Sequence, residues 1–390
     1  MKLSRYNIYV PYKDGNIVYN SRTYQIAYIS GSLDSASTNS EQYDGGGILV
    51  PDDVNEVELM REHLQTRFES DKLYRVELMI TQKCNLSCSY CYQSLDDFKR
   101  IDMCDNIIDA SIAFINSLDH PATVTFYGGE PLLQLQKIEY ICKRLHNVAR
   151  FSIITNGINL NYEVAQKLVQ LGITHCQVTL DGLSDDHNKL RKFVNGDGTY
   201  DIILKNIVEA IPTGLKITIR TNVSTQSKKS LQTFYLSFYK NRLYKKISFS
   251  ISDVIGNTTD RQETIYSLFY RFLCMGFDIN CPITVPCQIS SGKNFVVDSE
   301  GYIYPCMFYA GVDPVKSFGH VLNGINPEKL HAYKELSPWS TCLHCKYVGV
   351  CAGGCRVRGT QYNEKYCQKK LLSSVLHEEI KQAYIQLEES

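Results

Sequence analysis

Six short β-rich segments alternate with six helical patterns between residues 74 and 276, and this alternation constrains the fold more than any other feature. The expected strands cover residues 74–80, 122–127, 151–155, 174–180, 215–223 and 246–251. The expected helices cover residues 107–118, 135–146, 162–171, 201–210, 229–239 and 264–275. Such alternation builds right-handed βα units on a parallel sheet. Because six units are too few for a closed barrel of eight strands, we expect an α/β fold, an open partial (β/α)6 barrel.

Eleven of the chain's 15 cysteines fall into two patterned groups. The first group, Cys84-x3-Cys88-x2-Cys91, directly follows the first expected strand. The second group lies nearer the C-terminus and consists of Cys281, Cys287, Cys306, Cys342, Cys345, Cys351, Cys355 and Cys367. Three thiolates can hold a four-iron cluster and leave one iron open for a ligand, whereas four thiolates saturate it. The counts therefore suggest one open, reactive cluster and two closed ones.

The bulk composition excludes several classes of partner. The formal net charge is zero, and lysine and arginine are not segregated from the acidic residues, so we expect no nucleic-acid partner. No apolar run is long enough to span a bilayer and the first residues lack a signal-peptide core, so we expect no membrane partner and a cytoplasmic location. The odd number of cysteines argues against a disulfide framework.

Polar and glycine-rich motifs follow the expected strands one after another. After the second to the fifth strand come Gly128-Gly129-Glu130-Pro131, Thr155-Asn156-Gly157, Asp181-Gly182 and Thr221-Asn222. Chemistry in sheets of this kind lies at the C-terminal ends of the strands. We therefore expect these motifs to meet the three-cysteine loop at one edge of the sheet.

The three-cysteine loop resembles the signature of the radical SAM superfamily, with Tyr90 as its aromatic partner. The segment FYGGEP (Phe126–Pro131) resembles that family's GGEP motif, which cradles the amino group of S-adenosylmethionine. The resemblance implies that Cys84, Cys88 and Cys91 are the catalytic, metal-binding residues of an open [4Fe–4S] cluster. This cluster would cleave S-adenosylmethionine reductively, and the resulting 5′-deoxyadenosyl radical would abstract hydrogen from a substrate.

Further cofactor contacts follow from the same resemblance. Besides Tyr90, Gly128, Gly129 and Glu130, we expect Asn156, Thr179 and Arg191 to bind S-adenosylmethionine. Arg191 lies in a segment resembling the one whose arginine meets the ligand's carboxylate, a role that suits its bidentate donors. The alternative for Arg191 is a solvated surface charge, and Asn222 and Arg220 are weaker candidates. The alternative for the three cysteines is a zinc or thiol motif, although zinc usually takes four ligands.

The C-terminal cysteines resemble the SPASM extension of radical SAM enzymes that modify peptides, with Gly301–Cys306 as a short hairpin. The resemblance implies two auxiliary [4Fe–4S] clusters, the first held by Cys281, Cys287, Cys306 and Cys355 and the second by Cys342, Cys345, Cys351 and Cys367. Two zinc ions remain the alternative, because CxxC followed by more cysteines also describes zinc ribbons. Iron is favoured because zinc cannot carry electrons away from a reacting substrate.

We expect three domains, with boundaries at residues 1–72, 73–280 and 281–390. The first should contain a hairpin of Tyr6–Val10 and Ile17–Tyr19 and a helix that begins near Asp52 or Asp53, both good caps. It could be a packing subdomain, or an adaptor whose strand edge pairs with an extended peptide. The second should be the barrel and the third the SPASM region.

The residue after the hairpin cysteine bears on the substrate. Sulfatase-maturating enzymes carry an Asp base there, whereas this chain carries Met307, whose thioether cannot take a proton. We therefore expect a maturase that oxidatively modifies, and crosslinks, a ribosomally made precursor peptide, with a flavodoxin- or ferredoxin-type reductant. The alternatives are an anaerobic sulfatase-maturating (formylglycine-forming) enzyme and, outside this class, a structural zinc protein or a ferredoxin-like electron carrier.

Overall fold

The computed structural model describes residues 1–31, 46–70, 72–94, 99–254, 259–280, 287–335, 339–355, 367 and 369–389. The chain forms two compact units, each made of segments that are not contiguous in sequence. The first unit contains residues 1–71, 282–290 and 336–390, and the second contains residues 72–281 and 291–335. This division differs from the three consecutive domains expected, because residues 291–335 group with the barrel.

The second unit is built on an 11-stranded sheet of order β14-β13-β12-β10-β9-β8-β6-β15-β16-β17-β18. Its six central strands are those expected from the sequence: β6 (Tyr74–Thr81), β8 (Ala122–Gly128), β9 (Val148–Thr155), β10 (Ile173–Thr179), β12 (Lys216–Val223) and β13 (Ser248–Asp253). Each of the six pairs in parallel with the next along the chain. The row starts at β14 and ends at β18 without closing, which confirms the open, partial α/β barrel.

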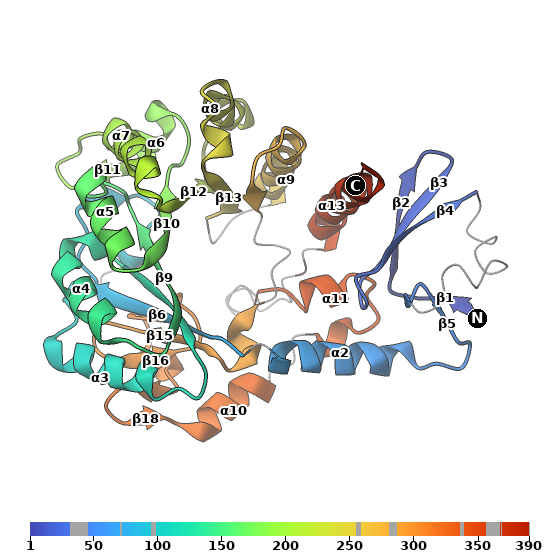
Figure 1. Cartoon of the computed structure of the whole chain (residues 1–390), viewed down its shortest axis with the longest axis horizontal. Coiled ribbons are helices and arrows are strands. Elements are labelled where there is room, and N and C mark those ends of the chain that lie inside the picture. Colours follow the sequence, from blue (N-terminus) through green and yellow to red (C-terminus); the bar gives the residue numbers. More distant parts are fainter. Residues whose placement is uncertain are drawn as a thin grey trace. The chain divides into compact units, whose positions relative to one another are not determined.

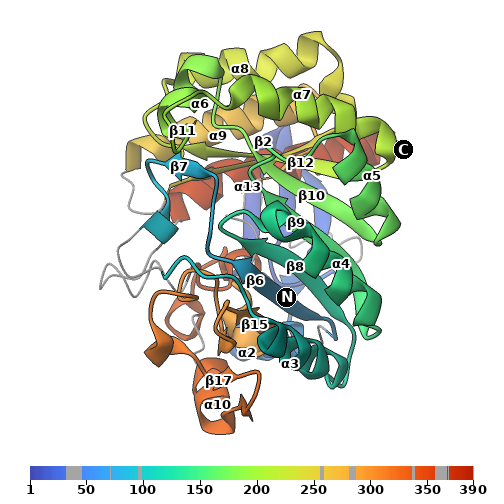
Figure 2. The ribbon, with the colours of Figure 1, turned by 90° about the vertical axis from the view of Figure 1, so that its left-hand side faces the viewer.

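A helix follows each of these six strands. They are α3 (Asp105–Asn116), α4 (Leu135–Arg144), α5 (Tyr162–Gln170), α7 (Tyr200–Ala210), α8 (Lys228–Lys240) and α9 (Thr259–Cys274). Helices α3, α4 and α5 lie side by side in front of the strands in Figure 2. Two of the helices have side-chain caps, since Asn161 accepts from the amide of Val164 at 2.9 Å and Ser227 from that of Ser230 at 3.1 Å.

The two faces of this sheet differ in chemistry. One face carries buried apolar residues, among them Val76, Leu78, Phe126, Ile153, Val178 and Ile219. The other face carries a polar row in register, which includes Glu77, Thr125, Ser152, Gln177, Thr218 and Arg220. A parallel sheet covered by helices on both sides is apolar throughout its strands. The polar face is therefore the interior of the open barrel.

Residues 291–335 extend the sheet beyond β6, the first strand of the barrel. β15 (Asn294–Val297) pairs in parallel with β6, and a turn at Gly301 then leads into β16 (Tyr302–Tyr304), antiparallel to β15. A short hairpin is therefore present, but it begins at Asn294, and the expected segment Gly301–Cys306 contains only its second strand. β17 (Gly319–His320) and β18 (Gly324–Ile325) complete the antiparallel edge, and α10 (Pro327–Glu335) follows. At the opposite edge, β14 (Ile279–Asn280) pairs in parallel with β13.

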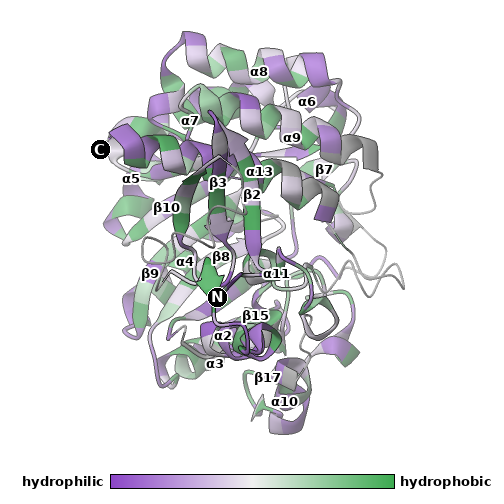
Figure 3. Cartoon of the chain, turned by 90° about the vertical axis from the view of Figure 1, so that its right-hand side faces the viewer, coloured by the Kyte–Doolittle hydropathy of each residue, from purple (hydrophilic) through white to green (hydrophobic). Residues whose placement is uncertain are grey.

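The first unit contains a three-stranded antiparallel sheet and two longer helices (Figure 1). The sheet consists of β2 (Asn7–Tyr12), β3 (Gly15–Asn20) and β4 (Ile26–Ser30), which confirms the N-terminal hairpin. β1 (Lys2–Leu3) pairs with β5 (Leu49–Val50), and the helices are α2 (Glu56–Ser70), α11 (Val348–Cys351) and α13 (Lys369–Glu389). Apolar residues of α13 pack on the sheet, and Figure 3 shows the hydrophobic stretch along β2.

Helix α2 begins later than expected from the sequence. Its first residue is Glu56, and Asn55 accepts a hydrogen bond from the amide of Glu58 at 3.3 Å, so Asn55 is the cap. The side chain of Asp52, one of the two expected caps, instead accepts from the N-terminal ammonium group at 2.9 Å. The apolar face of the helix is as expected, since Met60, Leu64 and Phe68 are buried. Among the described residues, no helix combines the length and apolarity that a membrane crossing requires.

Candidate active site

The three-cysteine loop leaves the barrel at the end of β6 and contains β7 (Leu86–Cys88) and a 3-10 turn, Tyr92–Ser94. Burial raises the pKa of the Cys84 thiol and raises that of Cys88 to about 11. The neighbouring thiols contribute to both shifts, Cys91 to that of Cys84, and Cys91 and Cys84 to that of Cys88. Over the described part of the chain, no group of three or more His, Cys, Asp or Glu side chains is placed so that it could hold a metal ion. Metal binding by these thiols would have to displace their protons.

A second short strand holds this loop in place. β11 (Arg191–Phe193) pairs antiparallel with β7, so that Arg191 lies opposite Cys88 and Phe193 opposite Leu86. Arg191 is only 7% exposed, which excludes the alternative of a solvated surface charge. Its positive charge lowers the pKa of the Cys88 thiol, against the larger effect of burial.

Arg191 is the first member of a chain of hydrogen bonds that runs across the ends of the strands. Its Nη1 donates to the Tyr90 hydroxyl at 3.0 Å, and that hydroxyl donates to Asp181 Oδ2. Asp181 Oδ1 accepts from the amide of Asn222 at 2.8 Å, and Asn222 Nδ2 donates to the Tyr90 hydroxyl at 3.3 Å. The Nε of Arg191 is buried and has no partner among the described residues. A buried guanidinium with an unused donor fits an anionic ligand group such as a carboxylate.

His187 has a structural role in this network. Its Nδ1 accepts from the amide of Asp181 at 3.2 Å, and its Nε2 lies 3.0 Å from the Thr199 hydroxyl. That hydroxyl donates to the carbonyl of Arg191 at 2.6 Å, so Nε2 must carry the proton and donate to Thr199. Burial lowers the pKa of His187 to about 3, which keeps the ring neutral. His187 thus joins the end of β10 to the strand that begins at Arg191.

Gly128 and Gly129 allow a close approach of two backbones. A Cβ on Gly128 would lie 2.1 Å from the carbonyl oxygen of Thr81, and one on Gly129 would lie 2.1 Å from that of Lys83. The amides of Gly129 and Glu130 donate to these same two carbonyls, each at 2.8 Å. The glycines therefore fix the chain that leads into Cys84. Their contact with S-adenosylmethionine stays a prediction.

Glu130 and Asn156 also hold the loop that contains Cys84. Glu130 is fully buried and accepts from the Thr155 hydroxyl at 2.6 Å, from the amide of Asn156 at 2.7 Å and from the amide of Leu132 at 3.0 Å. The amide group of the Asn156 side chain donates to Asn85 Oδ1 at 2.7 Å and lies 3.8 Å from the Cys84 sulfur. Both residues hold the cysteine loop, and a direct ligand contact for either stays a prediction.

The remaining candidates lie on the polar face of the sheet. Thr179 ends β10 and is opposite Arg220 in the register. Arg220 donates to Asn222 at 3.1 Å and to the hydroxyl of Ser250 at 3.4 Å. These polar groups line the barrel interior beside the cysteine loop, and the role of Thr179 in cofactor binding stays a prediction.

Two contributors, Asp181 and Gln226, were not among the residues expected to bind S-adenosylmethionine. Asp181 accepts from Tyr90, and Gln226 donates to the carbonyl of Asp181 at 2.7 Å and to that of Asn222 at 3.1 Å. The sequence held a signal for Asp181, because Asp181-Gly182 follows a strand as the other motifs do. Gln226 carries no such signal, since it lies beyond the end of β12 in an ordinary polar stretch.

The cysteines assigned to the second auxiliary cluster belong to the first unit. The pKa of the Cys351 thiol is raised to about 11, chiefly by burial and to a smaller extent by the thiols of Cys342, Cys345 and Cys367. That these four cysteines hold one cluster stays a prediction. In the set assigned to the first auxiliary cluster, Cys281 lies outside the described residues, Cys287 and Cys355 belong to the first unit, and Cys306 belongs to the second. That set stays a prediction.

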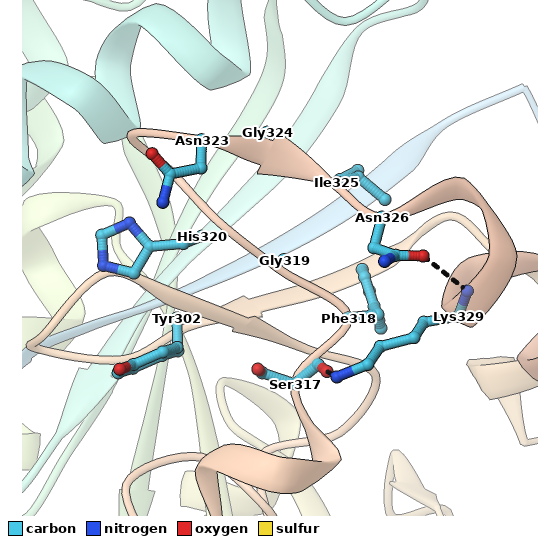
Figure 4. Close-up of a pocket in the computed structure, with 10 residues that line it drawn as sticks. All are labelled: Tyr302, Ser317, Phe318, Gly319, His320, Asn323, Gly324, Ile325, Asn326 and Lys329. Atoms are coloured by element: carbon cyan, nitrogen blue, oxygen red, sulfur yellow. Dashed lines mark hydrogen bonds between the residues drawn. The ribbon is translucent and has the colours of Figure 1, made fainter.

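A separate pocket lies at the antiparallel edge of the sheet, between β16 and α10 (Figure 4). Two of its polar side chains, Lys329 and His320, form hydrogen bonds with backbone groups of the protein. Lys329 Nζ donates to the carbonyl of Ser317 at 3.1 Å, and the ring nitrogens of His320 lie 3.0 Å from the carbonyl of Glu300 and 3.2 Å from the amide of Leu322. The pocket therefore offers little to bind a charged ligand.

Comparison with known proteins agrees with this geometry. Residues 78–234 match the family model described as the Radical SAM superfamily. A cysteine-type anaerobic sulfatase-maturating enzyme of Clostridium novyi (strain NT) is 24% identical over 328 residues, 71% of this chain and 86% of the relative.

Two solved structures share the fold. Native anSMEcpe with bound AdoMet is 20% identical with a TM-score of 0.64, over 81% of this chain and 100% of that one. Streptococcus suis SuiB bound to its precursor peptide SuiA is 14% identical with a TM-score of 0.58, over 95% of this chain and 99% of that one. With its cysteine loop, strand order and family match in agreement, the chain belongs to the radical SAM superfamily, as its sequence motifs predicted.

Proposed function

We propose that the chain is a radical SAM/SPASM maturase that oxidatively modifies, and crosslinks, a ribosomally made precursor peptide. The observation that carries this proposal is the pairing of the three-cysteine loop with the strand of Arg191, a buried residue whose Nε has no partner among the described residues. Membership of the superfamily implies one [4Fe–4S] cluster and S-adenosylmethionine. Two auxiliary clusters, held by the remaining patterned cysteines, and an external flavodoxin- or ferredoxin-type reductant belong to the proposal.

The residues present fit this cofactor set. Cys84, Cys88 and Cys91 would hold the cluster that cleaves S-adenosylmethionine, and the open iron needs a chelating ligand beside it. When bound, the cluster and S-adenosylmethionine supply a carbon radical that abstracts hydrogen. Arg191 would bind the ligand's carboxylate through its unused Nε, while Tyr90 and Asp181 hold the guanidinium in position.

The polar interior of the barrel would receive the substrate. Arg220 and Asn222 lie on this face, and serine or threonine side chains line its neighbouring strands. A peptide has many donors and acceptors, and such groups bind and orient it where an apolar wall would leave them unpaired. Structures similar in fold were solved with peptides bound, SuiA in SuiB and Cp18Cys in anSMEcpe, and these ligands support a peptide as substrate class.

The surroundings of Met307 favour a crosslinking maturase over a sulfatase-maturating enzyme. Met307 packs against a buried cluster that contains Tyr304, Tyr127 and Ala310, so an apolar environment surrounds the position of the base in sulfatase-maturating enzymes. The nearby carboxylate of Asp298 is occupied, because it accepts from the Tyr304 hydroxyl and the amide of Tyr302, each at 3.0 Å. The identity to the Clostridium novyi enzyme keeps the sulfatase-maturating activity as the second candidate.

Anaerobically purified protein tests the enzyme class. With S-adenosylmethionine and a reductant, the chain should release 5′-deoxyadenosine, and the triple substitution of Cys84, Cys88 and Cys91 by alanine should abolish it. Replacement of Cys104, Cys142 and Cys274, which lie outside both patterned groups, is the matched control. A colourless preparation that contains zinc and no iron would instead support the structural zinc protein.

Candidate substrates separate the two activities. Co-expression with short peptides encoded beside the gene should yield a peptide that has lost two hydrogens, with fragmentation showing a link between two residues. Conversion of a cysteine in a sulfatase-derived peptide to formylglycine, without change in the short peptides, would overturn the crosslinking proposal in favour of the second candidate.

A further inference from the structure

The first unit contains a second cysteine loop, residues 342–351, which packs directly on the N-terminal residues. Tyr6, Met60 and Leu64 form one buried cluster with Val348 and Ala352, and the side chains of Cys342 and Cys345 pack against it. A second cluster joins strands β2 and β3 to Tyr347 and Val350, with Cys345 and Cys351 at its edge. Three of the four cysteines assigned to the second auxiliary cluster therefore pack against clusters that contain N-terminal residues.

Hydrogen bonds fix the backbone of this loop between its cysteines. The Tyr6 hydroxyl, which is fully buried, donates to the carbonyl of Leu343 at 2.6 Å. Arg67 Nη1 donates to the carbonyl of Gly349 at 2.6 Å, and the Tyr24 hydroxyl donates to the same carbonyl at 3.3 Å. Leu343 lies between Cys342 and Cys345, and Gly349 lies between Cys345 and Cys351. N-terminal side chains thus hold this second cysteine loop both between Cys342 and Cys345 and between Cys345 and Cys351.

The close approach at Gly349 depends on its missing side chain. A Cβ at this position would lie 1.9 Å from the carbonyl oxygen of Ser21, which follows β3. Contact between backbone atoms leaves no flexible group that could move aside. The loop therefore lies against the N-terminal sheet in one position.

We propose that residues 1–31 and 46–70 are the scaffold of the second auxiliary cluster, and that Tyr6 and Arg67 are positioning residues for its ligands Cys342, Cys345 and Cys351. This inference rests on the proposed function, since that function assigns a cluster to these cysteines. This role differs from that of a separable adaptor that only binds a peptide, because the N-terminal residues would form the wall of the metal site. A structural metal site adds its binding energy to folding, so the N-terminal unit and the bound metal stabilise one another.

The positive charge of Arg67 should also affect the reduction potential of the auxiliary cluster. A cluster held by four thiolates carries net negative charge, and the potential of such a cluster depends on nearby charge and hydrogen bonding. A guanidinium that donates to a carbonyl between two ligands favours the reduced, more negative state. Removal of this charge should therefore lower the reduction potential of the auxiliary cluster.

Two variants with matched controls test the inference. Tyr6→Phe removes the hydroxyl that binds the loop, and Tyr12→Phe removes one that binds Glu388 at an exposed position of the same unit. Arg67→Met removes the guanidinium from the loop, and Arg61→Met removes one from the same helix that pairs with the exposed Glu58. Each protein is purified anaerobically and assayed for iron and sulfide per chain, for reduction potential, and for alkylation of Cys351.

We expect Tyr6→Phe and Arg67→Met to lose up to about four iron atoms per chain, the content of one cluster, and to expose Cys351 to alkylation. Any retained auxiliary cluster in Arg67→Met should be reduced at a lower potential. The controls should match the unmodified protein. Full iron content and unchanged potentials in both variants would overturn the inference. An unmodified protein with about four iron atoms in total would instead overturn the three-cluster proposal, so the two failures are distinguishable.

Discussion

Arg191 lies opposite Cys88 in the antiparallel ladder of β7 and β11, so a buried cation and a cysteine proposed as a cluster ligand are fixed by the same backbone pairing. The six barrel strands are parallel and joined by helices. The small ladder of β7 and β11 is separate from that sheet. It brings a residue that follows the fourth barrel strand to the loop that follows the first. The cation and the thiol are thereby held together before any ligand binds.

Arg191→Met should weaken S-adenosylmethionine binding. A hydrogen bond to a charged group contributes about 1.5–3 kcal/mol, so the loss corresponds to roughly 10- to 100-fold in the dissociation constant. The measurement is the titration of the change that S-adenosylmethionine causes in the cluster's electron paramagnetic resonance spectrum. Lys192→Met, at the exposed neighbouring position, is the control and should bind as the unmodified protein does. Equal affinity in both variants would show that Arg191 does not meet the ligand.

Glu130→Gln should loosen the cysteine loop. The carboxylate accepts from three donors, and an amide in its place would direct an N–H group at one or more of them. Loss of a buried hydrogen bond of this kind costs about 1–3 kcal/mol. Hydrogen exchange of residues 82–91 should accelerate accordingly. Glu139→Gln, an exposed carboxylate on α4 that pairs with Lys143 and Lys167, should leave this segment unchanged.

Gly129→Ala should prevent the cluster from assembling. The added Cβ would lie 2.1 Å from the carbonyl of Lys83, so the backbone that leads into Cys84 must shift. We expect the purified variant to lose up to about four iron atoms, the content of one cluster. Gly46→Ala is a suitable control, because a Cβ there would make only an ordinary contact of 3.4 Å with Gln25. A variant at Gly129 with full iron content would contradict the steric argument.

The periodic and local features were predictable from the sequence. All six strands and six helices of the barrel lie where the apolar patterns indicated, because each unit has its own period and its own turn. The cysteine loop and Gly128–Glu130 were found for the same reason, since a motif at a strand end reaches the edge of a parallel sheet. The helix expected from Asp52 or Asp53 began at Glu56, because Asp52 binds the N-terminal ammonium group instead.

Long-range pairings could not be predicted in this way. Val296 lies beside Glu77 across a parallel ladder although about 220 residues separate them in sequence, and no local period reports such a partner. The pairing of β7 with β11 was missed for the same reason. Tyr6 and the cysteine loop of the first unit are likewise remote in sequence, and their hydrogen bond depends on tertiary packing alone.

Glu77 gives the barrel a pH-dependent stability. It lies on the polar face between Val296 and Thr125, and burial raises its pKa from 4.5 to about 7, with a smaller opposing effect of Arg75. The folded chain therefore holds this proton more firmly than the unfolded chain does. Between pH 4.5 and about 7 the unfolded state binds fewer protons, so the free energy of unfolding should fall as pH rises.

Glu77→Gln removes this titration and should be more stable than the unmodified protein at pH 8, with the advantage shrinking toward pH 5. Hydrogen exchange of β6 at increasing urea concentration, repeated from pH 5 to pH 8, measures the local free energy of opening. Burial also raises the pKa of Glu379 to about 7, but Glu379 belongs to the first unit and is present in both proteins, so it cancels in the difference. A difference between the two proteins that stays constant across this pH range would show that Glu77 does not titrate there.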